Sequence, residues 1–176
     1  QWVTIPLAIH GIIYKNDGSE VEITIGENDT DPVFVIPDLL PHLAAEQNKL
    51  PLKEAIPGES LNLLMGSVPN IDTEVSDKVK ATILQLLNNK YGITEKDFIN
   101  AEIEVVPALK ARDVGIDKSF VGAYGHDDRV CAYTSLMAFF DASNTINDKT
   151  CYCYFSDKEE IGSYGNTGAQ CDTLTY

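Results

Sequence analysis

The pattern of apolar residues changes once along this chain, and the change constrains the fold more than any other feature. Before residue 107, strand-like segments such as Glu20–Ile25 and Ala101–Val106 alternate polar and apolar residues. Alternation of this kind is typical of strands with one buried and one solvated face. After residue 118, two short apolar runs, Phe120–Tyr124 and Cys151–Phe155, flank a helical pattern. Such runs are typical of buried strands, so the chain is predicted to have two parts that meet near residues 108–115.

The first part is predicted to be mostly β. Asn16-Asp17-Gly18 is a hairpin turn signal within residues 3–25. An apolar stripe at helical spacing predicts a helix over Glu74–Tyr91, capped by Asp72 or Thr73 and stopped by Gly92. Shorter elements are expected at Val33–Ile36 (strand), Pro37–Glu46 (helical turn) and Leu61–Met65 (strand).

The second part is predicted to be a βαβ unit. A helix over Arg129–Asp141 should lie between the two apolar runs. Its predicted inward residues are Val130, Ala132, Tyr133, Leu136, Met137 and Phe140. A βαβ unit implies a parallel sheet with a right-handed crossover. The predicted fold class is therefore α/β, with an α+β arrangement in the first part.

The charge of the chain limits which partners it can bind, and its cysteines indicate the compartment in which it functions. The chain has 13 Lys and Arg residues against 27 Asp and Glu residues, a formal net charge of −14. This balance argues against binding to nucleic acid or to anionic membranes, and no apolar run approaches the roughly 18 residues of a membrane span. The four cysteines lack C-x-x-C spacing and are interpreted as small buried thiols of a cytoplasmic protein. The chain begins with Gln1 rather than Met, so we expect a piece of a longer protein.

Each apolar run of the second part is followed by two adjacent acids, Asp127-Asp128 and Glu159-Glu160. Because neighbouring parallel strands end at the same sheet edge, these carboxylates are expected to converge. A divalent cation site needs carboxylate or imidazole ligands, and hydrolysis needs one further carboxylate as a base. The spacing leaves an alternative open, namely two solvated acidic loops in a protein with 27 acidic residues.

Two long motifs resemble one peptidase family. The stretch Gly125–Tyr133 resembles the DDRVCAY element of the M18 metallo-aminopeptidases, and Asp157–Ser163 with Gly168-Ala169-Gln170 resembles their EEIGS…GA element. Ala101–Ala108 and Leu61–Ser67 are similar to stretches of the bacterial aminopeptidase 1 branch. The resemblance runs in order from near residue 1 to residue 176.

The resemblance implies a hydrolase that releases single N-terminal residues from peptides. Such enzymes carry two divalent ions, most often zinc, with cobalt or manganese as alternatives. By resemblance, Asp127 bridges the two ions, Glu160 binds one of them, and Glu159 is the general base. A cis peptide bond is expected between Asp127 and Asp128.

The resemblance also implies roles for the first part of the chain. Residues 1–108 match an inserted dimerisation and lid domain, and residues 109–176 match part of a catalytic domain with a doubly wound sheet. His42, within Ile36–Leu43, matches a His that contacts substrate in the partner subunit's active site. Dimers and dodecamers are the implied assemblies. His10 is expected to be structural, and His126 matches no ligand.

The family pattern also contains ligands that match no residue of this chain: one His before it, and an Asp and a His after it. Two carboxylates alone bind zinc weakly. Two alternatives therefore stay open: a catalytically incomplete dimerisation and lid module, and a member of the related M42 glutamyl aminopeptidases. The preference for acidic or neutral N-terminal residues is left undefined.

Overall fold

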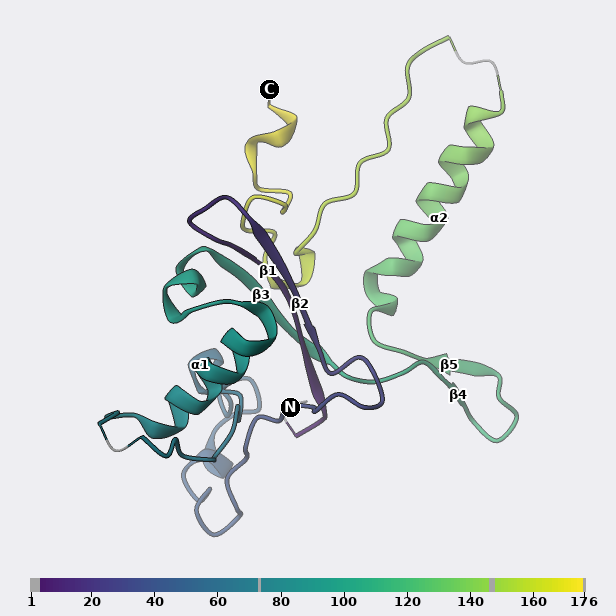
Figure 1. The fold of residues 1–176 in the computed structure, drawn as a ribbon. Helices are drawn as coiled ribbons and strands as arrows, with labels where there is room; N and C mark the ends of the chain where they lie inside the picture. Colours follow the sequence, from purple (N-terminus) through teal and green to yellow (C-terminus); the bar gives the residue numbers. More distant parts are fainter. Residues whose placement is uncertain (1–3, 73, 146–147, 176) are drawn as a thin grey trace. The chain divides into compact units, whose positions relative to one another are not determined.

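The structure is a computed structural model that describes residues 4–72, 74–145 and 148–175 (Figure 1). The chain divides into two compact units, Gln1–Gly122 and Ala123–Tyr176. It is a mixed α/β chain with two small sheets and helices. The division falls later than the predicted boundary near residues 108–115, and the assignment of residues 1–108 and 109–176 to an inserted and a catalytic domain stays a prediction. The cap residue Thr73 lies outside the described residues.

The first unit is built on an antiparallel sheet of order β2-β1-β3. Its strands are β1 (Leu7–Tyr14), β2 (Glu20–Ile25) and β3 (Ala101–Pro107). The central strand β1 pairs with both neighbours, Ile9 facing Ile25 on one side and Val105 on the other. The predicted hairpin is thus confirmed as β1 and β2, joined by the turn at Asn16-Asp17-Gly18, whereas residue 3 of the predicted span lies outside the described residues.

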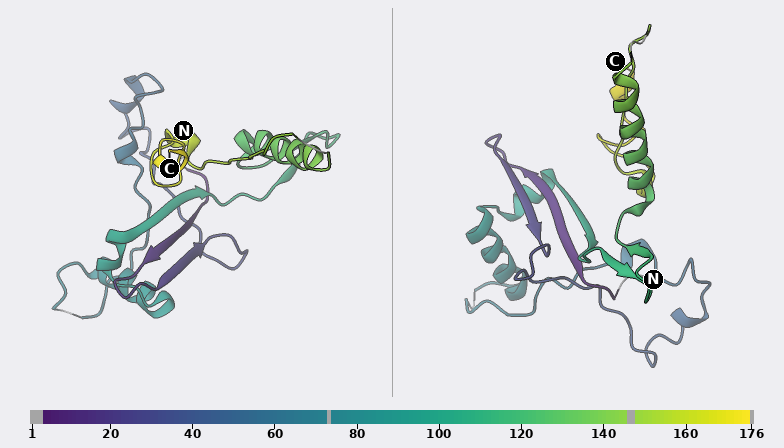
Figure 2. Two further views of the ribbon diagram at one scale, coloured as in Figure 1. Left: turned by 90° about the horizontal axis from the view of Figure 1, so that it is seen from above. Right: turned by 90° about the vertical axis from the view of Figure 1, so that its right-hand side faces the viewer.

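Alternate residues of the sheet form the core of the first unit. Leu7, Ile9, Ile13, Ile23 and Ile25 are buried together with Phe34 and Ile93. The helix α1 (Lys78–Tyr91) covers this face of the sheet (Figures 1 and 2), and its Leu87 and Tyr91 pack against the cluster. The alternation read from the sequence therefore selects the buried face of β2 correctly, whereas Ile103 and Val105 of β3 are exposed and Val106 is buried.

Gly11 lies at the closest approach of two strands. A Cβ atom at this position would be 2.3 Å from the carbonyl oxygen of Glu102 on β3. No other residue fits there without moving β3 away from β1, because real Cβ atoms do not come so close to backbone oxygens.

Helix α1 begins and ends by local capping. Asp77 accepts a hydrogen bond from the Lys80 backbone N–H (3.1 Å), and Gly92 ends the helix with a left-handed φ of 65°. The predicted stop is confirmed, whereas the helix begins later than predicted because Asp77, rather than Asp72, provides the N-terminal cap.

Several short elements differ from their predictions. Val33–Ile36 contributes one bridge, between Phe34 and Leu7, rather than a strand. Leu61–Met65 is not assigned as a strand, and Leu64 donates one backbone hydrogen bond to Val35 (2.9 Å). Pro37–Glu46 forms turns, because Pro41 has no N–H to donate. The remaining elements are η1 (Gln47–Lys49), η2 (Gly58–Ser60), η3 (Glu95–Asn100), β4 (Arg112–Val114), β5 (Phe120–Gly122), α2 (His126–Ser143), η4 (Glu159–Ile161) and η5 (Asp172–Leu174).

The predicted parallel βαβ unit is not formed within the described residues. β5 pairs with β4 in an antiparallel hairpin, and Cys151–Phe155 is extended without a partner strand. Parallel strands are stable when both of their faces are covered, but Tyr152 and Phe155 are exposed here. The predicted inward face of α2 is also exposed at Val130, Tyr133, Met137 and Phe140. None of the described helices is long and apolar enough to cross a membrane.

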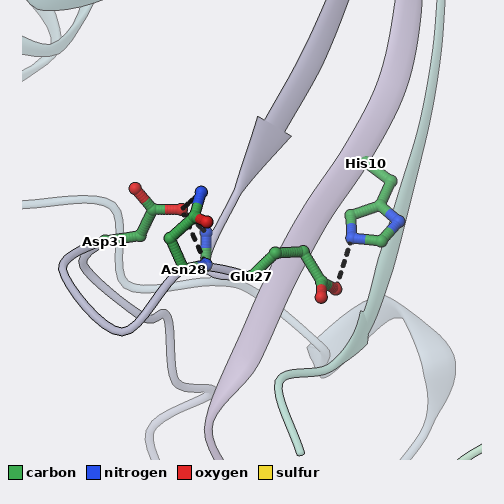
Figure 3. A network of polar contacts seen from close by, with 5 residues as sticks. His10, Glu27, Asn28 and Asp31 are labelled. Atoms are coloured by element: carbon green, nitrogen blue, oxygen red, sulfur yellow. Dashed lines mark hydrogen bonds and ion pairs between the residues drawn. The ribbon is translucent and has the colours of Figure 1, made fainter. Parts of the chain in front are cut away.

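A polar network closes the loop that follows β2 (Figure 3). One carboxylate oxygen of Asp31 accepts hydrogen bonds from the backbone N–H groups of Gly26 and Asn28 (both 3.2 Å) and from the Asn28 amide. These bonds hold the pKa of Asp31 below its ordinary value. Glu27 of the same loop contacts His10 of β1, with 2.7 Å between Oε1 and Nε2. His10 therefore has a structural contact, as predicted.

Replacing a fully buried core residue should destabilise the first unit. Ile93 is 1% exposed, so Ile93→Ala should lower the free energy of unfolding by roughly 2–5 kcal/mol. Ile99→Ala is the matched control, because Ile99 is 85% exposed and its change should stay within about 0.5 kcal/mol. Urea denaturation measures both values, and equal losses would contradict the assigned core.

The loop at Asp31 should lose stability on acidification. A carboxyl group with a lowered folded-state pKa stabilises the fold above its unfolded pKa of about 3.9, and this contribution is lost as the pH falls through the folded pKa. Asp31→Ala should therefore be less stable than wild type at neutral pH, and the difference should shrink from about pH 5 to about pH 2. Thermal unfolding across this range measures the difference. A pH-independent difference would show that the carboxylate charge has no part in it.

Candidate active site

The two glutamates of the predicted site lie on η4, a single 3-10 turn in the second unit. Lys158 and Gly162 bracket this turn with left-handed φ values of 66° and 97°. Within it, Gly162 donates a backbone hydrogen bond to Glu159 (3.0 Å), and Ser163 donates one to Lys158 (2.7 Å). The turn is thus closed by backbone bonds, which leaves the two glutamate side chains outside it.

Both glutamates are exposed. Within the described part of the chain, neither side chain has a hydrogen-bond or ion-pair partner. Carboxylates of this kind can take a ligand without first breaking an internal contact. Their oxygens can act as metal ligands or as a general base.

The returning segment Thr167–Gln170 lies against the turn. Asp157 donates its backbone N–H to Thr167 (3.0 Å), and Asp157 and Gly168 form a parallel bridge. The Gln170 amide donates to the Gly162 carbonyl oxygen (2.7 Å). The contact of Gln170 with the turn is not among the predictions made from the sequence. The residues Gly165-Asn166-Thr167-Gly168 are of the types that form turns, and they indicate that the chain reverses direction here.

A thiol and a phenol lie near the end of this segment. Cys171 Sγ lies 3.0 Å from the Thr173 hydroxyl, and this hydrogen bond is the main cause of a lowered Cys171 pKa. Desolvation, followed by the neighbouring Cys171, raises the pKa of Tyr154. The four cysteines are free. Cys131 and Cys151 are exposed and Cys153 and Cys171 are half-buried, so the prediction of buried thiols is wrong.

Asp127 lies in the first turn of α2. The Asp127-Asp128 peptide bond is cis, as expected. Asp127 itself has non-helical dihedral angles (φ −89°, ψ 117°), and Gly125 caps the helix with a φ of 83°. Asp127 is exposed.

His42 belongs to the first unit and is also exposed. It lies in a turn closed by hydrogen bonds from the Leu43 and Ala44 N–H groups to the Leu40 carbonyl (2.8 and 3.0 Å). The buried Ala44 holds this turn to the unit. The imidazole is thus presented outward, and its predicted contact with substrate stays a prediction.

The described residues do not by themselves make a zinc site. Across residues 4–72, 74–145 and 148–175, no group of three or more His, Cys, Asp and Glu side chains is placed to hold a metal ion. Zinc sites use at least three protein ligands with defined geometry. Asp127 and Glu160 are therefore not brought together with a third ligand within the described chain.

The chain was compared with known proteins. A family model described as Aminopeptidase I zinc metalloprotease (M18) matches residues 1–176. A protein of Clostridium acetobutylicum named "Probable M18 family aminopeptidase 1" is 54% identical over 170 residues, which cover 97% of this chain and 36% of that protein. The crystal structure of an M18 family aminopeptidase from Thermotoga maritima is similar with a TM-score of 0.83 and 51% identity, covering 98% of this chain and 37% of that one. The mApe1 dodecamer of S. cerevisiae shares the fold at a TM-score of 0.55 and 21% identity, covering 99% of this chain and 38% of that one.

These matches place the chain in a family described as zinc metalloproteases. The chain belongs to the M18 family, the aminopeptidase I metalloproteases. This confirms the resemblance seen in the two motifs and excludes the M42 alternative. The chain spans about a third of the length of the relatives that it matches, 36% for the Clostridium protein.

The 176-residue chain should bind zinc only weakly. Because its described residues offer no three-ligand group, zinc should be lost on dialysis, and added zinc or cobalt should produce no peptidase activity. Metal analysis after dialysis and a chromogenic peptidase assay measure the two outcomes. Retention of one or two zinc ions per chain with robust turnover would show that the site is complete within these residues.

Proposed function

We propose that the protein is a di-metal aminopeptidase that releases single N-terminal residues from peptides, and that this chain provides part of its active site. The observation that carries the proposal is the family match over residues 1–176, together with exposed carboxylates at the matching motif positions. Two divalent ions are proposed, zinc before cobalt or manganese. Zinc is placed first because the matching family is described as zinc metalloproteases.

The proposal gives each carboxylate a separate role. Asp127 would bridge the two ions with its two oxygens, and Glu160 would bind one of them. Bound zinc polarises a carbonyl and lowers the pKa of water. Glu159 would accept the proton of the attacking water on a carboxylate oxygen and later return it to the leaving amine. Adjacent residues suit this division, because their side chains leave the turn in different directions.

The remaining ligands would come from residues outside this chain. The described chain lacks a three-ligand group, while its relatives are far longer than the matched region. In the complete protein, further strands would pair with the extended run Cys151–Phe155 and cover the exposed face of α2, giving the doubly wound sheet. The apolar exposure of Val130, Tyr133 and Tyr152 supports this arrangement.

Residues 1–108 would act as the dimerisation and lid domain. His42 would then reach substrate in the partner subunit's active site, for which its outward position is suited. Assembly to dimers and dodecamers is proposed, because a yeast protein with the same fold is a dodecamer. A cytoplasmic location is proposed from the four free thiols. The absence of nucleic-acid and membrane partners is proposed from the net charge of −14. The alternative of a catalytically incomplete module applies to this chain when it is isolated.

Glu159→Gln in the full-length enzyme tests the proposed base. The amide cannot accept the proton, so kcat should fall roughly 10²–10⁴-fold. Zinc content should stay unchanged, whereas Glu160→Gln should lower it. Glu20→Gln, on the exposed side of β2, is the matched control and should keep wild-type turnover. Wild-type kcat in Glu159→Gln would eliminate the role given to this residue.

A further inference from the structure

We propose that Gln170 is a positioning residue for the catalytic turn and acts on Glu159 through the backbone of Gly162. The inference rests on the proposed function, since it assumes that Glu159 is the base. Gln170 is not one of the three carboxylate residues of the proposed site. The role given to it is to position the base, Glu159.

A short series of hydrogen bonds joins Gln170 to Glu159. The Gln170 side-chain amide donates to the Gly162 carbonyl oxygen at 2.7 Å. The Gly162 N–H donates in turn to the Glu159 carbonyl oxygen at 3.0 Å. The Gln170 backbone N–H also donates to Ser163 (3.1 Å). The turn is therefore held from outside at its C-terminal end by one side chain and one backbone group.

The N-terminal end of the turn is held by the same returning segment. Asp157 accepts the Thr167 hydroxyl (3.4 Å) and donates its own N–H to the Thr167 carbonyl (3.0 Å). At the other end of the turn, Gly168 permits the close passage of the segment, because a Cβ atom there would lie 2.1 Å from the Ser163 carbonyl oxygen. Segment 167–170 thus clamps both ends of η4 (Glu159–Ile161).

The clamp matters because the base has no contact of its own. The Glu159 side chain is exposed and has no hydrogen-bond or ion-pair partner within the described chain. Within the described chain, the backbone of the turn is therefore what positions this residue. A general base must lie within hydrogen-bond reach of the proton that it takes, and a displacement of about 1 Å can cost about 10²-fold in rate.

The test uses Gln170→Met in the full-length enzyme, because methionine keeps the length of the side chain but cannot donate. We expect kcat to fall roughly 10–100-fold while KM changes less than about threefold. Amide hydrogen exchange of residues 159–163 should increase in the metal-free protein. Gln170→Lys, which restores a donor, should recover kcat to within about fivefold of wild type.

Asn88→Met is the matched control. Asn88 also donates its side-chain amide to a backbone carbonyl, that of Ile93 (3.0 Å), but it lies in the first unit at the end of α1. The Asn88→Met variant should lose as much thermal stability as Gln170→Met. It should keep wild-type kcat and wild-type amide hydrogen exchange at residues 159–163. A purely structural role for Gln170 would make the two variants alike.

Four results separate the hypotheses. Wild-type kcat and exchange in Gln170→Met would overturn the inference. A loss of kcat that Gln170→Lys does not recover would also overturn it, because the donor would not be the cause. Full turnover in Glu159→Gln would instead remove the proposed function, whereas an inactive Glu159→Gln beside a wild-type Gln170→Met would refute the positioning role alone.

Discussion

The pairing of β1 on both of its edges is the constraint on which the first unit depends. One strand of eight residues supplies the register for β2 and β3, although β3 is separated from the hairpin by more than seventy residues of chain. The close approach at Gly11 and the buried side chains of Leu7, Ile9 and Ile13 act together. A shift of one residue would move these side chains to the solvated face, so the register and the core specify each other.

The parts of this unit that the sequence predicts are those specified by local chemistry. The hairpin turn at Asn16-Asp17-Gly18 and the stop at Gly92 follow from backbone preferences within a few residues. The start of α1 was missed because several acids precede it, and only the geometry shows that Asp77 reaches the Lys80 N–H. The sequence predicts a strand over Val33–Ile36, but the structure has only a single bridge there, from Phe34 to Leu7. An apolar run indicates that a segment is buried, but it does not indicate how many of its residues pair with another strand.

The second unit was predicted less well because its expected contacts are not local. All apolar side chains that are buried among the described residues lie in the first unit. The apolar runs around α2 identify residues that are suited to a covered sheet, but they do not supply the strands that cover it. The sequence could therefore indicate the kind of sheet, while its pairing depends on partners that these residues do not provide.

In the candidate site, the residues that carry the chemistry differ from the residues that hold the turn in place. The motif predicts which carboxylates carry the chemistry, and the structure shows that the turn bearing them is hydrogen-bonded to a different segment, Thr167–Gln170. Backbone donors and acceptors of the turn are used within the loop, while the carboxylates of Glu159 and Glu160 are left without partners in the described chain. Ordering the turn through its backbone leaves both oxygens of each carboxylate available to metal or water. A rigid support and an available carboxylate can therefore occur in the same three residues.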